Sequence, residues 1–290
     1  MLNLLITGSK GQLGHEFREA SALYPFYNFI FTDIGELDIT NAGNVERFFR
    51  DQNVDVVINC AAYTAVDQAE LEPDAAMRIN RDAVANLVNA CKMHITYMVH
   101  ISTDYVFDGK GSKPYREDDL TNPQSSYGRS KLAGEEAMLN CLEKGMIIRT
   151  SWLYSSFGAN FVKTIIKKGT ETGELKVVSD QFGCPTYAKD LAVTILDILP
   201  KALSSHRLEI FHYSNEGECS WFEFALAAVE MAKTSCRVYP VTSGEFPQKA
   251  PRPRYSVMDK TKIKEHFGIK IPEWKESLRE CLEVLAKGNT

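Results

Sequence analysis

Short apolar segments alternate with longer amphipathic segments along the first half of the chain. The apolar segments are six or seven residues long and rich in Val, Ile, Leu, Phe and Tyr, a pattern typical of buried strands. They cover Leu2–Thr7, Tyr27–Thr32, Val54–Asn59, Thr96–Ser102 and Gly145–Ser151. The segments between them indicate helices near 12–22, 43–51, 74–92 and 129–143. This alternation predicts a parallel sheet with helices on both faces.

Beyond Ser151 the pattern is less regular, and residues from 240 onward are richer in proline. We expect helices near 158–168, 188–199 and 221–233, and strands at 175–180 and 208–214. The predicted fold is α/β, a Rossmann-type doubly wound parallel sheet with a smaller C-terminal α/β region. Residues 1–150 are expected to form a dinucleotide-binding domain, and residues 151–290 mainly a substrate-binding region. We expect the chain to return to the first domain near 184–213.

The composition narrows the class of protein. A net charge of −5 over 290 residues gives no broad basic surface, so nucleic acid is not expected as a partner. No apolar run approaches the length of about eighteen residues that indicates a membrane span. Seven cysteines without CxxC spacing favour free thiols in a reducing cytoplasm, where we expect the protein to reside. Six histidines without metal-ligand spacing predict no metal site.

A glycine-rich turn, T-G-S-K-G-Q-L-G, lies between the first predicted strand and the first predicted helix. Such a turn lets the backbone approach a pyrophosphate that sits at the helix N-terminus. The turn therefore predicts a dinucleotide site, with a tight turn that binds no ligand as the alternative. The residues assigned to the cofactor here are Gly8, Gly11, Gln12, Leu13 and Gly14.

Two side chains near this turn point to different cofactors. Asp33 ends the second strand, nineteen residues after Gly14, where an acidic group binds ribose hydroxyls and favours NADH. Lys10 lies inside the turn and favours the 2′-phosphate of NADPH, although it is equally explained as a solvated loop lysine. The choice between NADPH and NADH stays open. Asp38 and Ile39 are expected beside the adenine, with a helix cap as the alternative for Asp38.

The third strand ends in small residues that allow a cofactor to lie close to the backbone. We assign Ala61, Ala62, Tyr63 and Thr64 to the cofactor site. The alternative is tight packing of the strand against the following helix.

Hydroxyl and ammonium groups follow the fourth strand. Thr103 lies at the carboxyl edge of the sheet, where a reacting carbonyl would sit, and Asp104 is placed to bond a sugar hydroxyl. Tyr127 and Lys131 are one helical turn apart, so both face the same side. A nearby ammonium lowers the pKa of a phenol from its usual value of about 10, and the same lysine can bind ribose. Small residues between them, Gly128 and Ser130, are expected to leave room for cofactor and substrate.

These motifs together with "RTSWLY", "DQFGCPT" and "RPRYS" resemble the extended short-chain dehydrogenase/reductases. Within them the chain is similar to the dTDP-4-dehydrorhamnose reductase family over nearly its whole length. The resemblance implies that NAD(P)H delivers hydride to C4 of a 4-keto nucleotide sugar. It also implies that Tyr127 donates the proton, Thr103 bonds the oxygen, and Lys131 tunes Tyr127.

The resemblance assigns further residues to a small-molecule nucleotide-sugar substrate. Trp152 matches a tryptophan that contacts the sugar, and Arg252 supplies a fork-shaped charge suited to phosphate. The full set implied for the substrate is Thr103, Asp104, Tyr127, Trp152, Asn160, Arg252 and Ser256.

Some members of the family form dimers bridged by Mg²⁺ through acidic side chains. Glu16 fits one of those positions, but Lys189 stands at another, and a lysine repels the ion. We therefore expect a monomer or a homodimer without a bound metal. Two other activities fit the fold: a 4-ketoreductase or epimerase for another nucleotide deoxysugar, and a non-catalytic NADP-binding subunit resembling the methionine adenosyltransferase β subunit.

Overall fold

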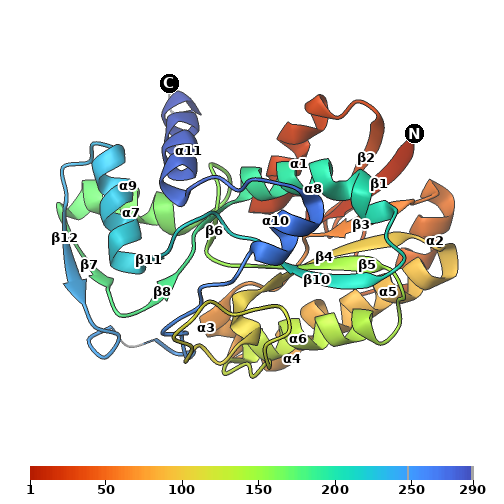
Figure 1. Ribbon diagram of the computed structural model, residues 1–290, viewed down its shortest axis with the longest axis horizontal. Coiled ribbons are helices and arrows are strands. Elements are labelled where there is room, and N and C mark those ends of the chain that lie inside the picture. The colour runs from red at the N-terminus through yellow and green to blue at the C-terminus, as the bar shows by residue number, and fades with distance from the viewer. Residues whose placement is uncertain (247, 289–290) are drawn as a thin grey trace.

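The computed structural model describes residues 1–246 and 248–288. A six-stranded parallel sheet forms the centre of the larger lobe (Figure 1). The strand order is β10-β5-β4-β3-β1-β2, and each neighbouring pair is parallel. The order reverses at β1, so the crevice at the carboxyl ends of β1 and β3 is the expected ligand position. The strands are β1 (Leu2–Thr7), β2 (Tyr27–Phe31), β3 (Val56–Asn59), β4 (Tyr97–Thr103), β5 (Gly145–Thr150) and β10 (Leu208–His212).

Helices cover both faces of this sheet, as the strand–helix alternation predicts (Figure 1). One face packs on α1 (Gln12–Ala20) and α8 (Ala188–Leu203). The opposite face packs on α2 (Ala42–Gln52), α5 (Ala83–His94) and α6 (Ser126–Leu139). The segment before α5 consists of α3 (Val66–Ala69), α4 (Pro73–Met77) and a π-helical turn at Arg78–Asp82. Single 3₁₀ turns occupy Ser21–Leu23 and Asp104–Val106.

A smaller lobe follows β5 and lies at the left of Figure 1. Its helices α7 (Phe161–Thr172) and α9 (Trp221–Met231) pack beside the parallel pair β7 (Glu174–Val178) and β12 (Arg237–Val241). Two further pairs contain only two residues a strand: β6 (Leu153–Tyr154) with β9 (Thr186–Tyr187), and β8 (Phe182–Gly183) with β11 (Cys219–Ser220). The chain ends in α10 (Thr261–Phe267) and α11 (Trp274–Gly288).

The α/β fold with a parallel sheet is confirmed. The helix predicted at 129–143 begins earlier, at Ser126, because the Ser125 side chain caps it by accepting a bond from the Gly128 N–H. Tyr127 therefore lies in the first turn of α6. The sequence pattern did not predict α10, α11, β12 or the two-residue strands. Within the described residues, no helix has the length and apolar character needed to cross a membrane.

Candidate active site

The glycine turn connects β1 to α1 and forms one wall of a cavity. Gly11 is the N-cap of α1 and no side chain caps this helix, so its first N–H groups are available to a ligand. A Cβ atom on Gly14 would lie 2.5 Å from the carbonyl oxygen of Gly8, so only glycine allows this tight turn. The turn therefore has the form of a phosphate-binding helix N-terminus.

The cavity runs along the carboxyl ends of the strands and has a volume of about 680 Å³. A second cavity of about 250 Å³ adjoins it and shares Gly8, Gly11, Cys60 and Ala62 as lining residues. Of the residues assigned from the sequence, the larger cavity is lined by Gly8, Gly11, Gln12, Leu13, Gly14, Ala62, Thr64, Thr103, Asp104, Tyr127, Lys131, Trp152 and Asn160. The smaller one is lined by Gly8, Gly11, Asp33, Asp38, Ile39, Ala61 and Ala62.

Three of the assigned residues line neither of these two cavities. The Tyr63 hydroxyl donates to Glu72 at 3.1 Å, and its side chain lines neither cavity. Ser256 is buried next to the Asp104 carboxyl; burial raises the pKa of that carboxyl to about 6, and a hydrogen bond with Ser256 partly opposes the rise. Arg252 is bonded to Asp67 and lines a third cavity.

The smaller cavity contains both carboxylates assigned to the adenosine end of a cofactor. Asp33 accepts bonds from the backbone N–H groups of Lys10 at 3.0 Å and Ile34 at 2.9 Å, which fix its position beside the glycine turn. The Lys10 ammonium lies 3.6 Å from the Glu36 carboxylate on the exposed rim. Asp38 accepts from both the N–H and the hydroxyl of Thr40, while the cap of α2 is Asn41. The helix-cap alternative for Asp38 is therefore wrong.

Thr103 at the end of β4 and Tyr127 and Lys131 in α6 all line the larger cavity. The Thr103 hydroxyl donates to Asp104 at 3.0 Å, and a hydrogen bond with Thr103 partly opposes the rise that burial causes in the pKa of Tyr127. The Lys131 ammonium donates to the carbonyl of Ile101 at 2.6 Å. Two hydroxyl groups and one ammonium group thus surround the place that a reacting carbonyl would occupy.

Burial dominates the protonation of this group. It raises the pKa of Tyr127 to about 12, with the Asp104 carboxylate adding to the rise. The same burial lowers the pKa of Lys131 to about 8, which nearby Glu135 partly opposes. The expectation that Lys131 lowers the phenol pKa is therefore wrong for this arrangement, in which the ammonium is bonded to the Ile101 carbonyl. Tyr127 is a fully protonated acid at neutral pH.

A buried ion pair lies next to these groups, and nothing in the sequence pattern predicted it. Arg149 on β5 donates to both carboxylate oxygens of Glu135 on α6, at 3.0 and 2.7 Å. Ser102 donates to the same carboxylate at 2.5 Å. The three contacts tie the end of β4 and β5 to the helix that carries Tyr127 and Lys131.

Asn80, in the π-helical turn, makes a second link that sequence reasoning did not find. Its side chain accepts from the Tyr63 N–H at 2.8 Å and donates to the Ser130 hydroxyl at 2.9 Å. Ser130 in turn donates to the carbonyl of Tyr127 at 2.8 Å. An asparagine inside a helical pattern carries no local signal of these contacts.

Trp152 is held in an unusual backbone conformation, with φ of 48°, which is strained for a residue that has a side chain. Its indole stacks on Trp221, with ring centroids 3.6 Å apart, and the ring packs against Gly183. Phe161 packs on Trp221 at 4.5 Å, and all three rings line the cavity. Because one face of Trp152 is covered, the tryptophan pair forms a rigid aromatic wall.

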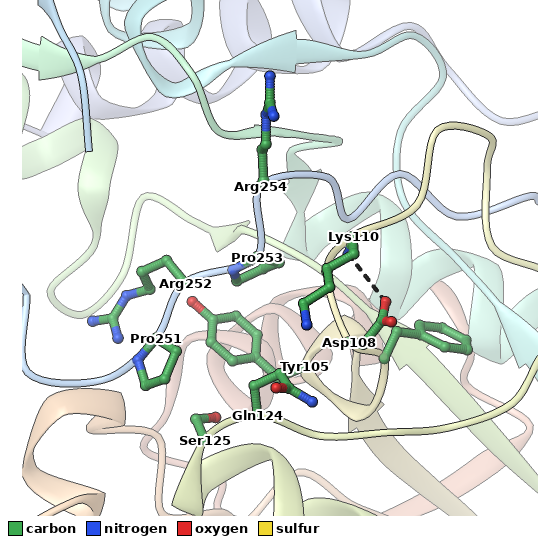
Figure 2. Close-up of a pocket in the computed structure, with 11 residues that line it drawn as sticks. Tyr105, Asp108, Lys110, Gln124, Ser125, Pro251, Arg252, Pro253 and Arg254 are labelled. Carbon is green, nitrogen blue, oxygen red and sulfur yellow. Dashed lines mark hydrogen bonds between the residues drawn. The ribbon is translucent and has the colours of Figure 1, made fainter. Parts of the chain in front are cut away.

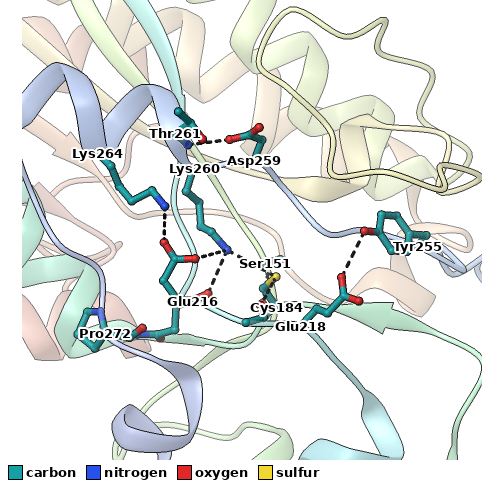
Figure 3. Close-up of polar contacts among 12 residues, drawn as sticks. Ser151, Cys184, Glu216, Glu218, Tyr255, Asp259, Lys260, Thr261, Lys264 and Pro272 are labelled. Carbon is teal, nitrogen blue, oxygen red and sulfur yellow. Dashed lines mark hydrogen bonds and ion pairs between the residues drawn. The ribbon is translucent and has the colours of Figure 1, made fainter.

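A cluster of polar groups anchors the chain next to this wall (Figure 3). The buried Lys260 ammonium lies 3.5 Å from the Glu216 carboxylate and 3.9 Å from the Cys184 sulfur. The Cys184 carbonyl accepts from the Ser151 hydroxyl at 2.7 Å, directly before Trp152. Lys264 pairs with Glu216 at 2.7 Å. The cluster fixes the segment after Gly183 against the end of β5.

The third cavity, of about 270 Å³, lies between the turn at 108–110 and the segment 251–254 (Figure 2). Tyr105 lines both this cavity and the larger one, so the two adjoin. Lys110 and Arg252 line it together with the acidic Asp108, and the Arg254 side chain extends away from them in Figure 2.

Glu16 is buried in α1, where burial raises its pKa, and it accepts from the Ser155 hydroxyl at 2.6 Å. Lys189 forms an ion pair with Glu280 and also lowers the pKa of Glu16. The described part of the chain contains no cluster of three or more His, Cys, Asp or Glu side chains arranged to hold a metal ion.

Comparisons with known proteins agree with this geometry. Residues 2–287 match the family model described as the RmlD substrate binding domain. A curated relative from Bacillus subtilis, the spore coat polysaccharide biosynthesis protein SpsK, is 42% identical over 98% of both chains. The dTDP-4-dehydrorhamnose reductase of Aggregatibacter actinomycetemcomitans is 38% identical over 96% of this chain and 98% of that protein.

A solved structure of dTDP-4-dehydrorhamnose reductase from Bacillus anthracis, in complex with NADP, is 40% identical. It superimposes with a TM-score of 0.93 over 98% of this chain and 100% of that one. The family match and the full-length relatives confirm the resemblance drawn from the motifs. The chain therefore belongs to the RmlD family, which contains the dTDP-4-dehydrorhamnose reductases.

Proposed function

We propose that this protein reduces the C4 keto group of dTDP-4-dehydro-L-rhamnose to give dTDP-L-rhamnose, with Tyr127 as the proton donor. The observation that carries the proposal is the convergence of Thr103, Tyr127 and Lys131 in one cavity, between the glycine turn and the Trp152 wall. The names of the full-length relatives support the choice of substrate.

The residues of the two joined cavities fit NADPH or NADH. The uncapped N-terminus of α1 suits a pyrophosphate, and Asp33 in the smaller cavity suits the hydroxyls of an adenosine ribose. Gly8 and Ala62 line both cavities and leave space for a ligand that passes from one to the other. When bound, this cofactor supplies the hydride that reduces the keto carbon.

Tyr127 has the protonation state that a reduction requires. Hydride addition turns a carbonyl oxygen into an alkoxide, which must receive a proton. With a pKa of about 12, Tyr127 keeps its proton at neutral pH until the stronger base forms beside it. Thr103 offers a second hydroxyl to the same oxygen. Lys131, with a pKa of about 8, remains largely charged at neutral pH, and its ammonium is a donor suited to the ribose hydroxyls of the cofactor.

The groups around Tyr127 suit the other parts of a nucleotide sugar. The Asp104 carboxyl is buried next to Thr103 and accepts hydrogen bonds, which fits a sugar hydroxyl. The stacked indoles of Trp152 and Trp221 give an apolar wall for a 6-deoxy sugar. Asn160 caps α7, and its side chain reaches Gln12 of the glycine turn at 3.0 Å, so it stands between the cofactor and substrate parts of the cavity.

The test is the turnover of NADPH and of NADH by the purified protein with dTDP-4-dehydro-L-rhamnose. We expect net oxidation of the cofactor, and a loss of about 10²- to 10⁴-fold in kcat for Tyr127→Phe because general-acid catalysis is removed. Tyr239→Phe, which alters an exposed tyrosine on β12, is the matched control and should keep the full rate. A Tyr127→Phe variant that retains most of the rate would refute Tyr127 as the acid. Absence of net cofactor consumption by the wild type would refute the reductase.

A further inference from the structure

Asp67, in α3, connects this short helix after β3 to the segment that carries Arg252, 185 residues away in the sequence. One of its carboxylate oxygens accepts the backbone N–H of Ala250 at 2.9 Å. The other accepts from Nη2 of Arg252 at 2.8 Å. The two oxygens of one carboxylate thus hold both the backbone and the side chain of this segment.

The Arg252 guanidinium is consequently held in place, but not all of its N–H groups have a hydrogen-bond acceptor in the described part of the chain. Its side chain is only 15% exposed, Nη1 donates to the carbonyl of Ala250 at 3.3 Å, and Nη2 donates to Asp67. Its Nε–H makes no hydrogen bond with any described residue, so part of the fork remains open to a second anion. In Figure 2 Arg252 extends from the segment that borders the third cavity, close to Tyr105.

The segment that leads into Asp67, residues 62–66, also lines the larger cavity. Ala62, Thr64 and Val66 contribute to its wall, and Val66 directly precedes Asp67 in α3. A ligand in the cofactor part of the cavity would therefore contact the same segment, residues 62–67, that holds Arg252. A cofactor in the cavity and an anion at Arg252 would therefore both contact the segment that contains Asp67, which allows the binding of one to affect the binding of the other.

We propose that Asp67 is a positioning residue that aims Arg252 at the diphosphate of the nucleotide sugar, and that cofactor binding strengthens this alignment. The inference rests on the proposed function, because it takes a nucleoside diphosphate as the anion. A guanidinium fork that is already ordered loses less side-chain entropy when it binds a phosphate. Without the Asp67 carboxylate, the fork must be ordered by the substrate itself.

The experiment measures the Kd of dTDP for the whole protein by titration calorimetry, with and without saturating NADP⁺. Asp67→Asn keeps the size of the side chain and removes its charge. Ordering one side chain changes affinity by roughly two- to twelvefold, so we expect the Kd of dTDP to rise about that much in Asp67→Asn. The KM for the nucleotide sugar should rise by a similar factor with kcat unchanged. The wild type should bind dTDP more tightly with NADP⁺ than without it, and Asp67→Asn should lose most of that difference.

Two controls separate positioning from a structural effect. Asp74→Asn removes the same charge from an exposed position in α4 and should leave the Kd of dTDP unchanged. In an Arg252→Gln background, Asp67→Asn should have almost no further effect, because its target is gone. Equal Kd values for wild type and Asp67→Asn, or effects that simply add in the double variant, would overturn the positioning role. A wild type that does not bind dTDP at all would overturn the proposed substrate, and with it the role of Asp67.

Discussion

The position of Trp152 depends on Gly183, and an alanine at position 183 tests this directly. A Cβ atom there would lie 2.6 Å from Cε2 and 2.7 Å from Cζ2 of the Trp152 ring. It would also lie 2.9 Å from the Ser256 hydroxyl. Because φ of Gly183 is not positive, alanine fits the backbone, and the whole effect comes from these contacts.

The contacts set the size of the expected effect. Carbon atoms pack at about 3.5–4.0 Å, so the indole must move by about 1 Å to accept the new methyl group. Its stacked face is already at 3.6 Å from Trp221, which leaves no free space on that side. Overpacking of this kind costs about 1–3 kcal/mol of unfolding free energy. A displacement of about 1 Å in the site lowers the rate by up to about 10²-fold.

The assay compares Gly183→Ala with the wild type in steady-state turnover and in urea unfolding. We expect kcat/KM for the nucleotide sugar to fall about 10- to 100-fold, and the Kd of the cofactor to stay the same. Near-ultraviolet circular dichroism should report the altered Trp152–Trp221 stack. Gly43→Ala is the matched control, since its nearest neighbouring atom is 3.6 Å away on the exposed start of α2. Normal turnover and normal stability in Gly183→Ala would refute the idea that Gly183 positions Trp152.

Two further predictions concern the buried charges. Glu135→Gln leaves Arg149 without its partner, so urea unfolding should show a loss of about 3–5 kcal/mol; a loss below about 1 kcal/mol would contradict a structural role for this ion pair. The pKa of Lys131 is about 8 in the folded protein instead of its ordinary 10.5. Between pH 8 and pH 10.5 the unfolded chain therefore binds more protons than the folded protein. The contribution of Lys131 to the free energy of unfolding consequently rises with pH in this range. The difference in unfolding free energy between the wild type and Lys131→Met should therefore change from pH 8 to pH 10, and a constant difference would refute the lowered pKa.

The sheet could be predicted because its signal is local. Each long strand is a mostly apolar run, and β5 is buried at every position, as a parallel strand covered on both faces requires. The pairs β6–β9 and β8–β11 have only two residues a strand, which is too short for any periodic pattern. Their partners lie more than thirty residues apart, so only the packed chain brings them together.

The residues of the candidate site also fall into those that local spacing predicts and those that only contacts between distant segments reveal. Tyr127, Lys131 and the glycine turn were assigned from spacings of a few residues, and the structure places them in one cavity. The links Glu135–Arg149 and Asp67–Arg252 join residues 14 and 185 positions apart. A charged residue in a helix or loop is usually solvated, so its local sequence contains no sign that a distant partner has buried it. The reversed pKa shift of Tyr127 has the same origin, since burial is set by the whole fold.

The small residues of α6 allow close packing of the helix against neighbouring backbone, and they do not border the ligand cavity as the sequence suggested. A Cβ atom on Gly128 would overlap the carbonyl oxygen of Tyr105, and one on Gly134 would overlap the carbonyl oxygen of Asn80. Ser130 is fully buried and bonded to Asn80. The prediction that Gly128 and Ser130 leave room for cofactor and substrate is therefore wrong.

These residues let α6 approach the turn after β4 on one side and the π-helical turn on the other. That close approach determines where the first turn of α6 stands relative to the end of β4. Tyr127 is in this turn, and Thr103 is the last residue of β4. The distance between the two hydroxyl groups is thus set by backbone contacts at the glycines, which tolerate far less adjustment than contacts between flexible side chains. The position of Tyr127 is therefore determined by the packing of the helix that carries it.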